Sequence, residues 1–252
     1  MVSAIGVELE VEERGSGPAV LLVHGIASDH LALEPLAEEL AGHGARVVSY
    51  SRRGYASSGA PEPYVGTTVQ EQAEDAAALA AAVGVRNAVV VGDGFGALVV
   101  LDLLVRHPGI ARAAVLADPP LLAFVEGGAL ALATWHEELR EAVAAGGPAA
   151  AVELWLAGRA APADLARARA AHRAFFADWA GLASLPLTRG TLRAIDIPVV
   201  VVTGSDSPPP VVAAADVLAG LVSDAERTTD GDLGAAAQSL LRRGGEPQMT
   251  SK

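Results

Sequence analysis

The sequence of 252 residues contains no cysteine and only one lysine, Lys252, at its very end. Without cysteine the protein cannot form disulfides, thiolate metal sites or a thiolate nucleophile. The position of the lone lysine argues against Schiff-base chemistry. A covalent mechanism would therefore need another kind of side chain.

Positive charge is also scarce, since 18 basic residues face 30 acidic ones and the formal net charge is -12. Such a chain repels phosphate backbones and anionic lipid headgroups, so neither nucleic acid nor a membrane is expected as a partner. The start, MVSAIGVELEVEER, has no basic segment followed by an apolar core, and no apolar run is long enough to span a bilayer. We expect a cytoplasmic protein; monomer and homodimer both stay open.

Short β-branched segments alternate with longer amphipathic segments, a pattern that predicts parallel strands joined by crossover helices. A helix over 69–83 is indicated by Thr68, with Glu71 three residues later, and by Gly84 at its end. The expected fold class is α/β, with a mostly parallel, doubly wound sheet. Its strands are predicted at 6–13, 19–25, 46–51, 87–93, 113–119, 198–204 and 225–230.

Between residues 120 and 190 this alternation stops, and helical patterns follow one another over 129–145, 150–158 and 164–181. An insert of this kind lies outside the carboxyl ends of the strands, where α/β sheets bind ligands. We therefore divide the chain into a core, residues 1–120 and 191–252, and a helical lid, residues 121–190. The lid holds all three tryptophans, most of which are expected to pack lid helices together, while Trp135 is assigned to the ligand surface.

Five segments, in order, resemble motifs of the α/β-hydrolase superfamily. The resemblance implies that family's fold, with the lid inserted after the sixth strand of the family's count, here 113–119. Ser51 and Ala56 depart from the family's pattern in the second segment. The segments are LLVHGIASDH (21–30), SYSRRGYASSG (49–59), VVVGDGFGALVV (89–100), IPVVVVTGSDSPPP (197–210) and TTDGDLG (228–234), which are similar to the His-Gly loop, the Asp-x-Arg-Gly-x-Gly-x-Ser segment, the nucleophile elbow, the acid strand and the histidine loop.

The same resemblance implies that the catalytic triad is missing. In the family, a histidine removes the proton of a serine and an acid orients the histidine. Here the serine position holds Gly94, the acid position holds Ser207, with Asp206 one residue too early, and the histidine position holds Asp232. Asp118 follows strand 113–119, where some relatives keep their acid, but Asp-Pro at a strand end is more typical of a turn.

The main-chain part of such a site survives. The resemblance places an oxyanion hole at the N–H groups of Phe95 and Ile26, which need no particular side chain. The helix that follows the elbow adds the positive end of its dipole, and Gly94 enlarges the space in front of these donors. Together with His30 and Trp135, these residues form the expected substrate-binding set.

Acid–base groups must come from other side chains. Asp232 is the first candidate, because it occupies the histidine position and burial would raise its pKa, with Asp93, His136 and His172 as further catalytic candidates. A solvated loop aspartate and ordinary surface histidines are the alternatives left open. No spacing of histidine and acidic residues suggests a metal site, and no cofactor is expected.

These features favour a non-hydrolytic enzyme of specialised-metabolite biosynthesis. It would act on an apolar or aromatic, polyketide-like small molecule by cyclisation, isomerisation or C–C bond formation, through positioning, oxyanion stabilisation and proton transfer. Three alternatives stay open: a pseudo-hydrolase that binds a small apolar ligand, a hydrolase with a non-standard nucleophile, and a structural domain whose pocket is filled.

Overall fold

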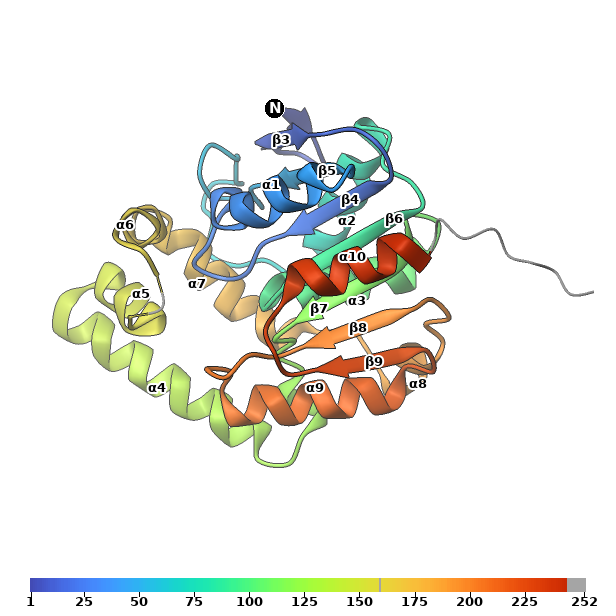
Figure 1. Ribbon diagram of the computed structural model, residues 1–252. Helices are drawn as coiled ribbons and strands as arrows, with labels where there is room; N and C mark the ends of the chain where they lie inside the picture. The colour runs from blue at the N-terminus through green and yellow to red at the C-terminus, as the bar shows by residue number, and fades with distance from the viewer. Residues whose placement is uncertain (159, 244–252) are drawn as a thin grey trace, which may run out of the picture.

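A seven-stranded sheet forms the centre of the protein, which a computed structural model describes over residues 1–158 and 160–243 (Figure 1). Lys252 and the end of the predicted core segment lie outside the described residues. All neighbouring strands are parallel except β3, which pairs antiparallel with β5. Across the sheet the order is β3 (Val11–Arg14), β5 (Arg46–Tyr50), β4 (Ala19–Val23), β6 (Ala88–Asp93), β7 (Ala111–Ala117), β8 (Val199–Val202) and β9 (Ala225–Thr228).

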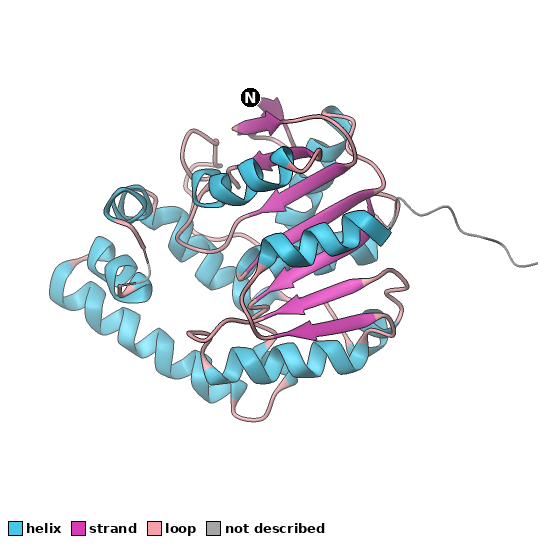
Figure 2. Cartoon of the chain, in the orientation of Figure 1, coloured by secondary structure: helices cyan, strands magenta, loops and turns pink. Residues whose placement is uncertain are grey.

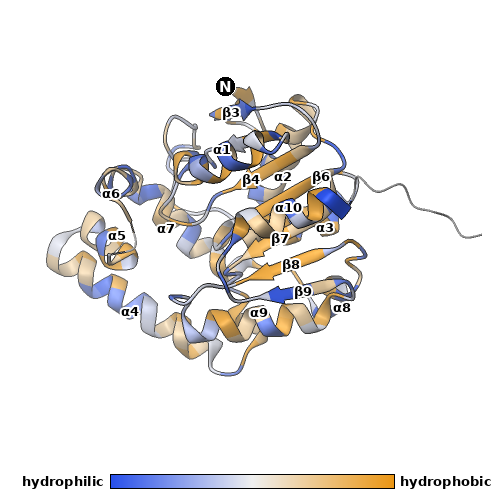
Figure 3. Cartoon of the chain, viewed as in Figure 1, coloured by the Kyte–Doolittle hydropathy of each residue, from blue (hydrophilic) through white to orange (hydrophobic). Residues whose placement is uncertain are grey.

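Helices cover both faces of this sheet (Figure 2). One face carries α2 (Val69–Ala82), α3 (Phe95–Arg106), α8 (Arg189–Arg193) and α9 (Pro209–Leu221), whereas the other carries α1 (Glu34–Gly42) and α10 (Leu233–Arg243). The central strands are strongly hydrophobic along their length (Figure 3), because both of their faces are covered. The predicted doubly wound α/β fold is therefore confirmed.

The predicted strand over 6–13 is interrupted. It consists of β2 (Glu8–Leu9), which pairs with β1 (Val2–Ser3), and the start of β3. Glu10 separates the two, because its N–H donates to the Ser58 hydroxyl (2.9 Å). The cap of α2 follows the prediction, since the Thr68 hydroxyl accepts from the Glu71 N–H (3.0 Å).

The lid follows β7 and contains η2 (Leu122–Phe124), α4 (Gly128–Gly146), α5 (Pro148–Leu156), α6 (Pro162–Ala170), α7 (His172–Gly181) and η3 (Leu182–Ser184). The predicted helix over 164–181 is thus two helices, which meet at Ala171. Arg167 of α6 then pairs with Asp29, whereas Asp178 of α7 pairs with Arg52. No helix in the described ranges combines the length and hydropathy needed to cross a bilayer.

The aromatic rings of the lid pack mainly on one another, as expected. Trp155 contacts Trp135 and Trp179 edge-on, with ring centroids 5.8 and 5.2 Å apart. Phe175 meets Phe176 in the same way at 5.0 Å. Edge-to-face aromatic pairs of this kind add to the stability given by burial alone.

Candidate active site

The corner between β6 and α3 keeps the shape of a nucleophile elbow around a glycine. Gly94 has φ 52° and ψ -116°, a conformation that is strained for any residue with a side chain. Gly96 lies so close to the end of β4 that a Cβ there would stand 2.3 Å from the Val23 carbonyl oxygen. The close approach of α3 to the sheet therefore depends on glycine, but Gly94 places no side chain at the nucleophile position.

A cavity of about 580 Å³ opens at this corner, between the carboxyl ends of the strands and the lid. No histidine is among the described residues that line it. Five of the predicted site residues do line it: Ile26, Asp93, Gly94, Phe95 and Trp135. They meet because Ile26, Gly94 and Phe95 follow strand ends, Asp93 is the last residue of β6, and Trp135 lies on α4 of the lid.

Two main-chain donors border the cavity. Neither the Ile26 N–H nor the Phe95 N–H has an acceptor among the residues that the structure describes. Phe95 is the first residue of α3, so the positive end of the helix dipole adds to its field. These groups provide the donors that an oxyanion hole requires.

The loop that carries Ile26 is held from behind by Arg52 and His24. The Arg52 side chain donates to the carbonyl oxygens of His24 (3.0 Å) and Gly25 (2.8 Å). The main-chain N–H of Arg52 donates to His24 Nε2 (2.8 Å). Burial keeps the pKa of His24 well below its ordinary value, so the ring is neutral and structural.

Asp93 presents a carboxylate to the cavity at the end of β6. It has no hydrogen-bond partner among the described residues, and its Oδ2 lies beside the Gly25 Cα. Burial, followed by the nearby negative charge of Asp118, raises the pKa of Asp93 to about 6, although Arg52 opposes the shift. A carboxyl group with such a pKa can exchange protons near neutral pH.

The raised pKa of Asp93 predicts a characteristic effect on stability. Between the unfolded pKa near 4 and the folded pKa near 6, the folded state binds the proton more tightly, so the stability contribution of Asp93 falls as pH rises. We expect Asp93→Asn to raise the free energy of unfolding by about 1–2 kcal/mol at pH 8 and by much less at pH 4. Urea denaturation at the two pH values measures this difference. If Asp93→Asn raised the free energy of unfolding less at pH 8 than at pH 4, the prediction would be wrong.

Asp118 is another carboxylate in the cavity, at a position where the Asp-Pro pair predicts a turn residue. It follows β7, adopts φ 43°, and accepts from the Ser207 hydroxyl (2.5 Å). The Gly204 N–H in turn donates to the Ser207 hydroxyl (2.8 Å), which orients its proton toward Asp118. Ser207, at the position expected for the family's acid, thus supports a carboxylate from the neighbouring strand. The Asp-Pro pair at the strand end was the available signal.

Asp232, the first catalytic candidate, does not line the cavity, and this corrects the prediction that it is a catalytic residue. It is exposed and stands before α10, where its Oδ1 accepts from the Ala235 N–H (2.8 Å) as a helix N-cap. Helix capping satisfies an otherwise unpaired N–H, and this holds the carboxylate at the surface.

Three histidines also lie outside the cavity lining. His136 is exposed and accepts from the Trp179 Nε1–H (3.1 Å), so it lies on the solvent side of the aromatic rings of the lid. His172 starts α7, where its ring lies 3.1 Å from the Arg169 carbonyl oxygen. These contacts assign both residues to the structure of the lid rather than to proton transfer.

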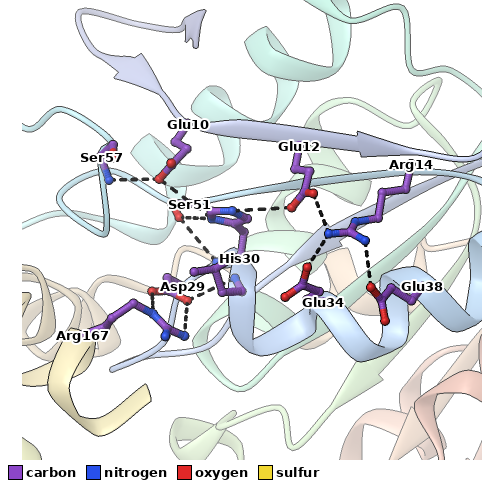
Figure 4. Close-up of polar contacts among 11 residues, drawn as sticks. Glu10, Glu12, Arg14, Asp29, His30, Glu34, Glu38, Ser51, Ser57 and Arg167 are labelled. Carbon is purple, nitrogen blue, oxygen red and sulfur yellow. Dashed lines mark hydrogen bonds and ion pairs between the residues drawn. The ribbon is translucent and has the colours of Figure 1, made fainter. Parts of the chain in front are cut away.

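The third of them, His30, is buried at the start of η1 (His30–Leu33), behind the cavity wall. Its Nδ1 lies 2.7 Å from the Ser51 hydroxyl, and the carboxylates of Glu10 and Glu12 stand at 4.0 and 3.8 Å from the ring nitrogens (Figure 4). These neighbours leave His30 within the core and not at the substrate surface. Among the described residues, no group of three or more histidine and acidic side chains could hold a metal ion.

The family model of the alpha/beta hydrolase fold matches residues 18–155, more than half of the chain. The chain belongs to this family. It is 35% identical over 125 residues to the uncharacterized hydrolase YraK of Bacillus subtilis, covering 50% of this chain and 46% of the relative. It is 32% identical over 170 residues to the 2-(acetamidomethylene)succinate hydrolase of Mesorhizobium japonicum, covering 65% of this chain and 57% of that enzyme. The chain thus spans about half the length of these curated relatives.

A solved structure extends the likeness over nearly the whole chain. An alpha/beta hydrolase from Sphaerobacter thermophilus superposes with a TM-score of 0.72 at 25% identity, covering 96% of this chain and 98% of that one. These relatives are named hydrolases, and none of the three is named a cyclase or lyase. The comparisons therefore give hydrolytic chemistry more support than the polyketide-type cyclisation that we expected from the sequence.

Proposed function

We propose that this α/β-hydrolase-fold protein is an enzyme that acts on a small carbonyl compound without attaching it to the protein, with Asp93 as general base. The observation that carries the proposal is the unpartnered Asp93 carboxylate in the same cavity as the free N–H groups of Ile26 and Phe95. Two such donors can hold a carbonyl oxygen as it gains negative charge. A base with a pKa of about 6 is mostly ionised at neutral pH and still basic enough to accept a proton.

In this proposal the group that attacks the carbonyl comes from outside the protein, because Gly94 gives the elbow no side chain at the nucleophile position. The names of the relatives favour water in this role. Asp93 would remove a proton from the water as its oxygen bonds to the carbonyl carbon, and would then return the proton to the leaving group. The same base acting on a C–H bond beside the carbonyl would give isomerisation or C–C bond formation.

Labelled water separates these reactions. The purified protein is incubated with small esters, lactones and ketones in oxygen-labelled water or in D₂O. We expect the acid product of one turnover to contain labelled oxygen while the protein stays unmodified. Deuterium that enters a ketone beside its carbonyl would instead identify carbon as the proton donor. Ligands that bind but show neither reaction would identify a binding protein and overturn the proposal.

A serine placed at the elbow should not create a serine esterase, which would form a covalent acyl-enzyme. A Cβ at residue 94 would meet only the Gly25 Cα, at 3.9 Å, so Gly94→Ser fits into the space, but its φ of 52° costs about 1–3 kcal/mol of stability. No histidine among the described cavity-lining residues can activate the new hydroxyl. We expect no burst of nitrophenol from p-nitrophenyl acetate with either the unmodified protein or Gly94→Ser. A stoichiometric burst from the unmodified protein would contradict the proposed mechanism.

A further inference from the structure

The described walls of the cavity carry a strong excess of negative charge. Five carboxylates and one guanidinium line it, and they come from separate elements: loops that follow β4 and β7, the end of β6, and the lid helices α4 and α6. Such convergence in a concave site focuses a negative potential on whatever the cavity binds. The residues are Asp29, Asp93, Asp118, Glu138, Asp164 and Arg167.

The positive charge of Arg167 is already paired with carboxylates of the protein. Its Nε donates to Asp29 Oδ2 (2.6 Å), and its Nη2 donates to Asp29 Oδ1 (3.2 Å) and to Asp164 Oδ1 (2.5 Å) (Figure 4 shows the Asp29 pair). One guanidinium therefore stands against two carboxylates. These three residues together repel an anionic ligand rather than attract it.

The other three carboxylates have no cationic partner among the described residues. Asp93 has no hydrogen-bond partner there, and Asp118 accepts from the uncharged Ser207 hydroxyl. Glu138 extends from α4 without an ion pair. The buried cation Arg52 lies behind the Gly25 loop and is paired with Asp178 (2.6 Å).

We infer that the substrate carries an ammonium or quaternary ammonium group in addition to the carbonyl group on which the proposed function rests. The carboxylates attract the cation over a distance, and the Trp135 ring on the lid side of the cavity gives its apolar substituents a surface to contact. An anionic substrate is disfavoured by the same charges. This inference differs from the apolar or aromatic ligand that the sequence suggests, which stays a prediction.

Three ketones that differ in one terminal group test the inference. They are (4-oxopentyl)trimethylammonium, its uncharged isostere 6,6-dimethylheptan-2-one, and the anion 5-oxohexanoate. None can be hydrolysed, so binding is measured apart from turnover. All three tryptophans lie in the lid and two line the cavity, so quenching of tryptophan fluorescence reports occupancy.

We expect the ammonium ketone to bind at least about tenfold more tightly than the isostere, and the oxohexanoate most weakly. Raising NaCl from about 50 to about 500 mM should weaken only the ammonium ketone. Glu138→Gln and Asp118→Asn should each reduce the preference for the cation about three- to tenfold. Glu137→Gln is the matched control, because Glu137 pairs with Arg140 (2.7 Å) and does not line the cavity.

Equal affinity for the ammonium ketone and its isostere, or strongest binding of oxohexanoate, would overturn the inference. So would a cation preference that neither Glu138→Gln nor Asp118→Asn reduces. These results are separate from the test of Asp93 as general base. A lost cation preference with turnover that still depends on Asp93 would reject only the substrate class, whereas an intact preference with turnover independent of Asp93 would reject only the general base.

Discussion

Asp93→Asn is expected to lower turnover about 100- to 10,000-fold, the range by which a positioned general base accelerates reactions. Asparagine keeps the size of the side chain but cannot accept the proton. Substrate affinity should change much less, because the Ile26 and Phe95 N–H groups still hold the carbonyl. The measurement is kcat and KM for the ester, lactone or ketone that the unmodified protein converts.

The pH profile of the unmodified protein gives the same prediction a second readout. Activity requires ionised Asp93, so kcat/KM should fall as pH drops through the raised pKa of about 6. An ordinary aspartate would lose activity only near pH 4. Asp232→Asn is the control, because that residue caps α10 at the surface and should leave both kcat and the pH profile unchanged. Full turnover in Asp93→Asn would refute the general base.

The main-chain part of the site could be predicted from the sequence. The apolar strands and the glycines around the elbow specify where β6 ends and α3 begins, and these ends alone place Gly94, Phe95 and Ile26. No side-chain orientation is needed for that inference. The strands and helices can be recognised from local sequence patterns. The short, right-handed connections between parallel strands then allow few other topologies.

Side-chain direction could not be predicted so well. Trp135 and His136 are neighbours on α4, yet only Trp135 lines the cavity, because successive helix residues point about 100° apart and the rotation of the helix depends on its packing. Asp232 turns outward because the start of α10 needs a cap. Asp118 turns inward because Ser207, 89 residues away, donates to it. Contacts between such distant positions leave no local signal in the sequence.

Asp178→Ala is expected to cost about 3–5 kcal/mol of stability, because it leaves a buried guanidinium without its partner. Both Asp178 and Arg52 are fully buried, with side-chain exposures of 0%. The Arg52 Nη1 and Nη2 donate to the two carboxylate oxygens at 3.0 and 2.6 Å. Gln72 (2.9 Å) and the Tyr55 hydroxyl (2.7 Å) donate to the same carboxylate. Urea denaturation measures the loss.

Two comparisons show whether the cost comes from the buried charge. Glu137→Gln removes an exposed partner of Arg140 in the same lid and should cost less than about 1 kcal/mol. The double variant Arg52→Met, Asp178→Leu should lose less than the sum of its single variants, since no charge is left unpaired. Arg52 also holds the Gly25 carbonyl beside the Ile26 N–H, so the double variant should recover stability without recovering activity. Strict additivity would mean that α7 is anchored by packing and that Arg52 and Asp178 act independently.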